Sequence, residues 1–278
     1  SNATLWWHRG RLRHYSLNAV DISQAASDYK HALSINPRLG VAWADLADCL
    51  DQMGRYGEAE AALESAFAVR KYSPLIRWQA GNFYLRRGNL SKMYECFKMA
   101  CLYDAQKLDI AMDISWKIDS EHQEILLKLI PDTMNANLRY LNFLVTRDEV
   151  NLAAPVWQRF LKNSTATDFE LKPASTFAYI DQLLTHARIS EALKVWNDIL
   201  RKTQSGLSDT RLTIKQPSTS DFASRNLIWI GSFEDEILRG GFDWRYGISS
   251  AIEFRIDAAN RMDGLKSLQV TFGGENIA

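Results

Sequence analysis

The side chains that could carry out chemistry do not form a catalytic arrangement along this chain. The carboxylates of residues 234–236 could act in general acid–base chemistry or bind calcium, but a solvated loop is the simpler interpretation. The five histidines, which have no metal-ligand spacing, are His8, His14, His31, His122 and His186. The sequence has no glycine-rich phosphate loop, no His-Glu-x-x-His helix and no nucleophile elbow. We therefore expect a protein that is not an enzyme and that needs no cofactor or metal ion.

The three cysteines, Cys49, Cys96 and Cys101, fall on expected helices. Their number is odd, and Cys96 and Cys101 are spaced so that they point in different directions on a helix. We expect them to be small packing residues, in preference to disulfides, zinc ligands or a nucleophile.

Aromatic side chains near the end of the chain form a second group suited to recognition. Trp229, Trp244 and Tyr246, together with Phe233 and Phe242, could stack on a sugar ring. The alternative is that they pack in a core. We treat Trp229, Trp244 and Tyr246 as candidate sugar contacts.

Composition limits the kind of partner. The chain has 278 residues, with 33 Lys and Arg against 33 Asp and Glu, so its formal net charge is zero. Nucleic acid and anionic membranes favour a basic surface, so neither is expected as the main partner. No apolar run approaches the roughly 20 residues that a transmembrane helix needs.

The elements that must position any site are helices in a repeat. The segments 21–25, 55–59 and 89–93 match one another at a constant spacing. Each is followed by a bulky residue and then by an alanine, namely Tyr29 and Ala32, Leu63 and Ala66, and Phe97 and Ala100. Small, bulky and small residues at i, i+4 and i+7 share one face of a helix. A face that repeats in this way is typical of a helical solenoid.

The repeat divides the first part of the chain into blocks 6–39, 40–73 and 74–107. Gly54 and Gly88 stand where each first helix should end, and glycine allows the chain to reverse there. Asn36-Pro37 and Ser73-Pro74 mark the block ends, because the residue before proline resists helix.

This pattern resembles the tetratricopeptide repeat family. The residues that carry the resemblance are Trp43, Ala80-Gly81, Tyr84, Ala25, Ala59, Phe97, Ala32, Ala66, Ala100 and Pro37. The first helix of the first block, near Trp6 to Leu17, departs from the family pattern. The resemblance implies a mostly α-helical chain, with helical hairpins stacked in a right-handed α-solenoid.

After the third block the repeat pattern becomes less regular, and it then recurs twice. Residues 108–131 are expected to form a shorter hairpin. The motif recurs at 149–153 before Trp157 and at 188–192 before Trp196, with a longer loop near 163–172. We expect both tryptophans to lie in the core.

The resemblance also implies a concave groove lined by the first helix of each hairpin. Transferred to this chain, the groove positions are Asp48, Asp51, Gln52, Trp78, Asn82, Arg86, Asn142 and Asp181. Asn82 and Asn142 could hold a peptide backbone, because an amide both donates and accepts hydrogen bonds. The alternative is an exposed face of solvated polar residues.

One departure from the family bears on the ligand. Members that clamp a C-terminal carboxylate carry cations in the groove, but the fifth helix position here is Ala44, Trp78, Leu138 or Phe177. An apolar or mixed peptide, or a segment of the chain itself, therefore fits better than a charged tail.

The last part of the chain changes character. Residues 252–257 and 268–272 alternate in the manner of half-buried strands, and 227–230 is a third candidate. The residues around Gly231, Gly241-Phe242-Asp243-Trp244 and Ser267-Leu268 resemble the opening of a galactose-binding-like jelly roll, although Ile230 replaces the usual Asn. A jelly roll needs about eight strands. We therefore expect an incomplete antiparallel β segment that packs against the last helices or pairs with a second copy as a homodimer.

The expected organisation is a tag remnant at 1–3, helical repeats at 4–204, a linker at 205–221 and the β segment at 222–278. The expected function is a scaffold that binds a peptide or partner protein in its groove, in a bacterial envelope or secretion setting. The alternative is a carbohydrate-associated protein that binds or assembles polysaccharide. Localisation stays open between the periplasm or cell envelope and the cytoplasm.

Overall fold

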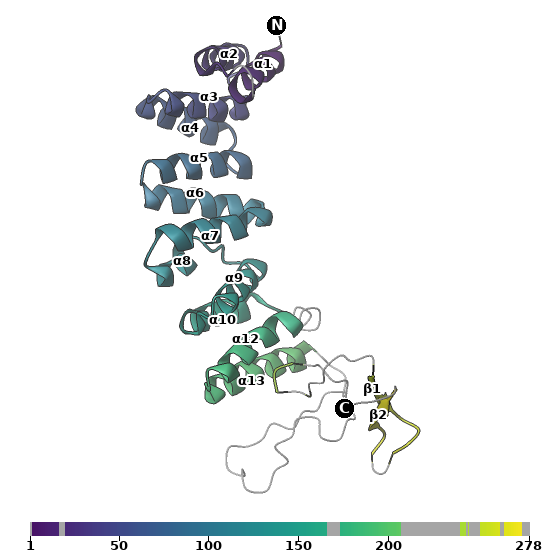
Figure 1. The fold of residues 1–278 in the computed structure, drawn as a ribbon. Coiled ribbons are helices and arrows are strands. Elements are labelled where there is room, and N and C mark those ends of the chain that lie inside the picture. The colour runs from purple at the N-terminus through teal and green to yellow at the C-terminus, as the bar shows by residue number, and fades with distance from the viewer. Residues whose placement is uncertain are drawn as a thin grey trace. The chain divides into compact units, whose positions relative to one another are not determined.

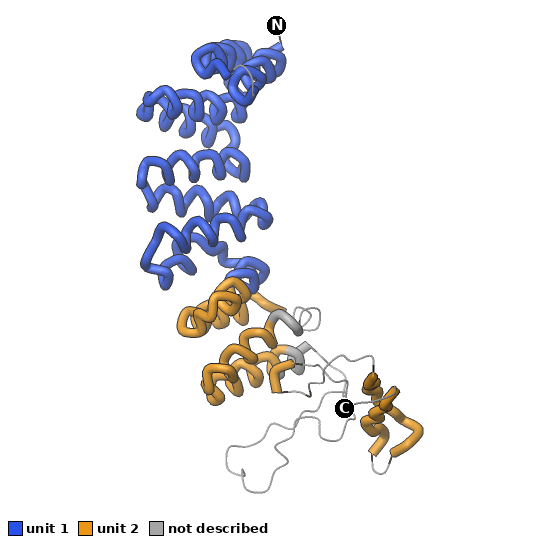
Figure 2. Tube along the Cα trace, viewed as in Figure 1, with its two compact units in different colours: residues 1–140 blue, residues 141–278 orange. Residues whose placement is uncertain are grey.

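In a computed structural model, the chain separates into two compact units, residues 1–140 and 141–278 (Figure 2). The residues that the structure describes are 2–16, 20–165, 173–206, 240–242, 244, 251–261 and 264–273. The boundary between the units falls inside the helix Met134–Thr146.

The first unit is a series of helical hairpins (Figure 1). Its helices are α1 (Ala3–Tyr15), α2 (Ile22–Ile35), α3 (Gly40–Gln52), α4 (Tyr56–Val69), α5 (Pro74–Arg86), α6 (Leu90–Tyr103), the 3₁₀ helix η1 (Ala105–Lys107), α7 (Leu108–Ile118), α8 (His122–Lys128) and the start of α9 (Met134–Thr146). The expected hairpins, including the short one at 108–131, are therefore confirmed.

Local signals set the ends of these helices. Asp21 and Asn89 accept hydrogen bonds from backbone N–H groups in the first turns of α2 and α6, and Ser73 does the same before Pro74 in α5. Gly54 and Gly88 have φ of 74° and 68°, the left-handed conformation expected at the turns. Asn2 caps α1, and Ala3, the first residue of the helix, is buried.

In the α1–α2 and α5–α6 hairpins, a glycine on the first helix lies against a large ring on the second. A Cβ on Gly81 would lie 2.3 Å from the ring of Phe97, and one on Gly10 would lie 2.6 Å from the ring of Tyr29. Tyr29 and Phe97 are fully buried. The small residues therefore set how closely the paired helices approach.

The first hairpin is out of step with the regular spacing. Three more residues separate Gly10 from Tyr29 than separate Gly81 from Phe97. The extra length falls in the connection between α1 and α2, which is longer than the one between α3 and α4. This explains why the first helix departs from the repeat pattern.

The second unit contains the end of α9 and the helices α10 (Val150–Asn163), α12 (Pro173–Thr185) and α13 (Ile189–Gly206). Trp157 and Trp196 are each 2% exposed, so both lie in the core as predicted. Trp157 also donates a hydrogen bond from Nε1 to Asp198 at 3.1 Å. The helix α13 continues past the expected boundary at 204, and the rest of the linker lies outside the described residues.

The last part of the chain contains an antiparallel pair of strands, β1 (Ile252–Asp257) and β2 (Ser267–Phe272). The register pairs Ile252 with Phe272, Phe254 with Val270 and Ile256 with Leu268, so the apolar residues share one face. The candidate strand at 227–230 lies outside the described residues. A mostly helical chain with a small antiparallel sheet at its end is thus confirmed.

No helix among the described residues is long and apolar enough to cross a membrane.

Candidate functional site

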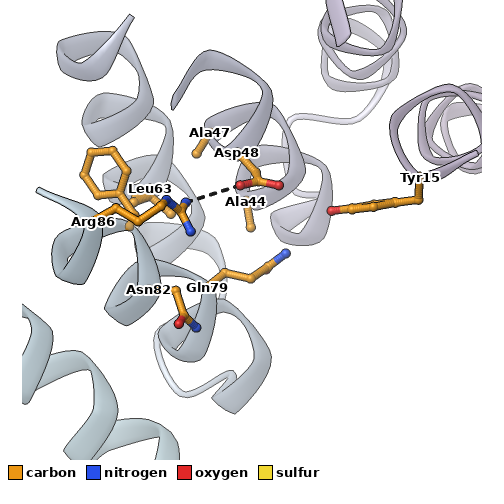
Figure 3. A pocket seen from close by; sticks show the side chains of 9 residues that line it. Tyr15, Ala44, Ala47, Asp48, Leu63, Gln79, Asn82 and Arg86 are labelled. Atoms are coloured by element: carbon orange, nitrogen blue, oxygen red, sulfur yellow. Dashed lines mark hydrogen bonds and ion pairs between the residues drawn. The ribbon is translucent and has the colours of Figure 1, made fainter. Parts of the chain in front are cut away.

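A hollow of about 230 Å³ opens among α1, α3 and α5 in the first unit (Figure 3). Its lining residues are Tyr15, Ala44, Ala47, Asp48, Leu63, Gln79, Asn82, Phe83 and Arg86. Small-molecule sites usually measure about 300–1,000 Å³. The hollow is smaller than that range, and its size suits one side chain of a larger partner.

Small residues on α3 create the floor of the hollow. Ala44 and Ala47 are buried and carry only a methyl group each, so the side chain of Leu63 on α4 also lines the hollow. Phe83 of α5 completes the apolar part of the lining. The floor therefore offers apolar contacts to an inserted side chain.

The rim is polar, and its cation is already paired. The Arg86 guanidinium lies 2.7 Å from Asp51 Oδ2 and 3.4 Å from Asp48 Oδ1. The side chain of Asp51 is only 4% exposed. A carboxylate arriving in the hollow would have to compete with two aspartates for Arg86.

A buried histidine of α1 contacts the polar residues of this rim. His14 of α1 is 4% exposed, and its Nε2 lies 3.0 Å from Gln52 Nε2 and 3.3 Å from Asp48 Oδ2. Its Nδ1 lies 3.3 Å from the Tyr29 hydroxyl and 3.6 Å from Cys49 Sγ. The position of Asp48 thus depends on contacts with α1 as well as with α5.

The neighbouring aspartates of α3 have opposite pKa shifts. The hydrogen bond with His14, aided by the charges of His14 and Arg86, lowers the pKa of Asp48 despite its partial burial. Burial raises the pKa of Asp45, although Trp7 Nε1 donates to it at 2.7 Å and Gln79 Nε2 at 3.2 Å. Asp48 is therefore the carboxylate best suited to carry a negative charge at the rim.

Several polar atoms of the rim remain open to a ligand. Asn82 donates from Nδ2 to the Trp78 carbonyl at 2.9 Å, and Gln79 donates to Asp45. Within the described part of the chain, Asn82 Oδ1 and Gln79 Oε1 accept no hydrogen bond. Tyr15 points its hydroxyl toward the hollow from α1 (Figure 3). These atoms can accept hydrogen bonds from backbone N–H groups.

The structure gathers three of the predicted groove residues, Asp48, Asn82 and Arg86, around the hollow. Gln52 lies beside Asp48, and its Nε2 donates to Asp48 Oδ2 at 3.2 Å. Asp51 is buried beneath Arg86 instead of facing a ligand directly. Trp78 stacks on Phe97 with ring centroids 4.6 Å apart, so much of its surface is used in packing.

Asn142 and Asp181 are both half-buried and belong to the second unit, on α9 and α12. Of the candidate sugar contacts, Trp244 is half-buried, and Trp229 and Tyr246 lie outside the described residues, as do residues 234–236. No group of three or more His, Cys, Asp or Glu is placed to hold a metal ion among the described residues.

Tyr15 and Gln79 line the hollow but were not predicted from the sequence. Tyr15 follows Gly10 at the same interval as Arg86 follows Gly81, so it occupies an equivalent groove position. Counting by the constant spacing hides this equivalence. The signal that could have revealed it is Gly10, the small residue that faces Tyr29.

Comparison with known proteins places the repeat motif on one part of the chain. Residues 19–71 match the family model described as tetratricopeptide repeat. That segment covers α2, α3 and α4, so it includes the floor of the hollow. No curated protein matches the chain.

The solved structures that match this chain share little sequence with it. PilF of Pseudomonas aeruginosa is 17% identical, with a TM-score of 0.39, over 73% of this chain and 96% of PilF. YrrB, titled a TPR protein with an unusual peptide-binding site, is 10% identical with a TM-score of 0.34, over 73% and 87%. The TPR2AB domain of yeast Sti1, in a complex with pHSP90, is 15% identical with a TM-score of 0.36, over 73% and 78%.

Proposed function

We propose that this chain is a protein-interaction scaffold and that the hollow among α1, α3 and α5 binds an extended peptide segment of a partner. The observation that carries the proposal is an apolar floor of side-chain size beneath open hydrogen-bond acceptors on Asn82 and Gln79. The tetratricopeptide match across residues 19–71 supports it.

The charges at the rim limit which kind of peptide the hollow can bind. Arg86 is the cation among the described residues that line the hollow, and its pairing with Asp48 and Asp51 leaves it poorly placed to bind a terminal carboxylate. The open atoms on Asn82 and Gln79 are acceptors and suit the N–H groups of a peptide backbone. The peptide we propose therefore inserts one uncharged apolar side chain and is held by its main chain.

The test is binding of arrayed ten-residue peptides to the whole chain, followed by fluorescence anisotropy with the selected peptides. Asn82→Ala removes one of the open acceptors, and we expect it to weaken binding about tenfold, the usual scale for one lost hydrogen bond. Gln123→Ala is the matched control, because Gln123 is an exposed polar residue on α8, outside the hollow. Equal binding of the selected peptides by wild type and Asn82→Ala would contradict the proposal.

The envelope setting and the carbohydrate-associated role are further proposals. They rest on the resemblance of Gly241-Phe242-Asp243-Trp244 to the opening of a sugar-binding module. Binding to a glycan array that Trp244→Ala abolishes would favour the carbohydrate role, and an array without signal would argue against it.

A further inference from the structure

The last hairpin of the second unit ends in an apolar surface. Phe177 and Ile180 of α12 and Trp196 of α13 form it, and they are 5%, 0% and 2% exposed. The rings of Phe177 and Trp196 are 5.7 Å apart. The end of a repeat array normally leaves such a surface open to water unless a capping element covers it.

A short segment from far along the chain lies on this surface. A Cβ on Gly240 would lie 2.5 Å from the Phe177 ring, and one on Gly241 would lie 2.5 Å from the Trp196 ring. Gly241 also has φ of 63°, which disfavours other residues. The Phe242 ring then meets Trp196 edge-on at 6.0 Å. The two glycines bring the backbone against the rings at a distance that no side chain permits.

The same pair of positions occurs in the first unit with a different cover. Trp78 and Phe97 are separated by as many residues as Phe177 and Trp196, and their rings stack at 4.6 Å. There the cover comes from the start of the following hairpin, where the Lys107 ammonium lies 5.6 Å from the Trp78 ring. Residues 240–242 thus cover Phe177 and Trp196 as the start of the next hairpin covers Trp78.

We propose that the end of α12 and α13 is a docking surface for the chain's own Gly240-Gly241-Phe242 segment, which acts as the C-terminal cap of the helical repeats. The cap takes the place of a further hairpin. It also keeps the apolar end from joining another molecule end to end, the kind of contact that produces open chains of subunits.

The test compares Phe242→Ala and Gly241→Leu with Phe272→Ala in the full chain. Phe242→Ala removes the ring, whereas Gly241→Leu adds a side chain where Trp196 leaves no room. Phe272 is the matched control, since it is a 67% exposed phenylalanine at the end of β2. The readouts are hydrogen exchange of backbone amides and molar mass by light scattering.

We expect amide exchange in α12 and α13 to rise about tenfold in both cap variants, because the surface loses an aromatic contact and its cover. Exchange in α3 to α6 should stay unchanged, and Phe272→Ala should behave as the wild type. Molar mass should rise with concentration in the cap variants alone. A synthetic peptide spanning residues 238–246 should restore protection to Phe242→Ala.

Unchanged exchange in α12 and α13 in both cap variants would overturn the proposal. So would an equal rise throughout the chain, because that result would indicate global destabilisation. Failure of the peptide to restore protection would refute a docking surface, and a constant molar mass would refute the role in preventing end-to-end association.

Discussion

Replacing Gly81 with alanine should destabilise the α5–α6 hairpin, although alanine is normally the better helix residue. The new methyl group would lie 2.3 Å from two atoms of the Phe97 ring, closer than packed carbon atoms tolerate. Phe97 is fully buried and stacked on Trp78, so its ring has little freedom to move away. Only a shift of one helix against the other would relieve the contact.

The magnitude follows from two opposing terms. Overpacking a well-filled core costs about 1–3 kcal/mol, and this contact falls toward the upper end. Alanine recovers about 1 kcal/mol of helix propensity over glycine. We therefore expect a net loss of ~2 kcal/mol, which corresponds to roughly thirtyfold faster exchange of amides that open with the hairpin.

Gly57→Ala is the matched control, because Gly57 lies in the first turn of α4 and, apart from its chain neighbours and the backbone of its own helix, no atom lies within 4 Å of its Cβ position. It should be neutral or stabilise by ~0.5 kcal/mol. Hydrogen exchange resolved by segment is the suitable assay, since repeat arrays need not unfold in one step. If Gly81→Ala slowed exchange in α5 and α6 as Gly57→Ala does in α4, the close contact would not limit the approach of the two helices.

Two further predictions concern buried groups. Burial raises the pKa of the Cys49 and Cys101 thiols to about 12 and that of the Cys96 thiol to about 11. A thiol reagent at pH 8 should therefore label none of the three in the native protein and all three in denaturant. Rapid labelling of the native protein would contradict this prediction. Burial acts to raise the pKa of Asp28, but hydrogen bonds and charges from Arg9 and Arg13 outweigh it and lower the pKa. The stability that the Asp28 carboxylate contributes is therefore fully present above its unfolded pKa of about 3.9. It is lost as the pH falls through the lower pKa that Asp28 has in the native state. Asp28→Asn should cost ~2 kcal/mol in urea unfolding at pH 7 and much less near pH 2; a pH-independent cost would refute the ionic contribution.

The helical hairpins could be predicted because each rests on a local signal. The small and bulky residues repeat on one helix face, and Gly54 and Gly88 adopt the conformation that a turn requires. The two strands could also be predicted, because alternation along residues 252–257 and 268–272 matches the observed register. These features depend on short stretches of sequence.

The remaining parts of the site depend on contacts between distant residues. Asp51 was expected to face a ligand, yet the pairing with Arg86 draws it under the rim. The equivalence of Tyr15 to Arg86 is hidden by the extra residues in the first connection, because a count at constant spacing passes over it. The contact of Gly241 with Trp196 joins segments far apart in the chain, and only the fold shows which ring faces which glycine.

The longer first connection bears on how far this architecture tolerates changes in chain length. The interface between α1 and α2 keeps the close pairing of Gly10 with Tyr29 although the connection is longer than in the next hairpin. The packed interior thus accepts three more residues in this connection than in the one between α3 and α4. Because Tyr15 lies on α1 five residues after Gly10, the packing of Gly10 on Tyr29 fixes its place, and we expect changes in connection length to leave the lining of the hollow intact.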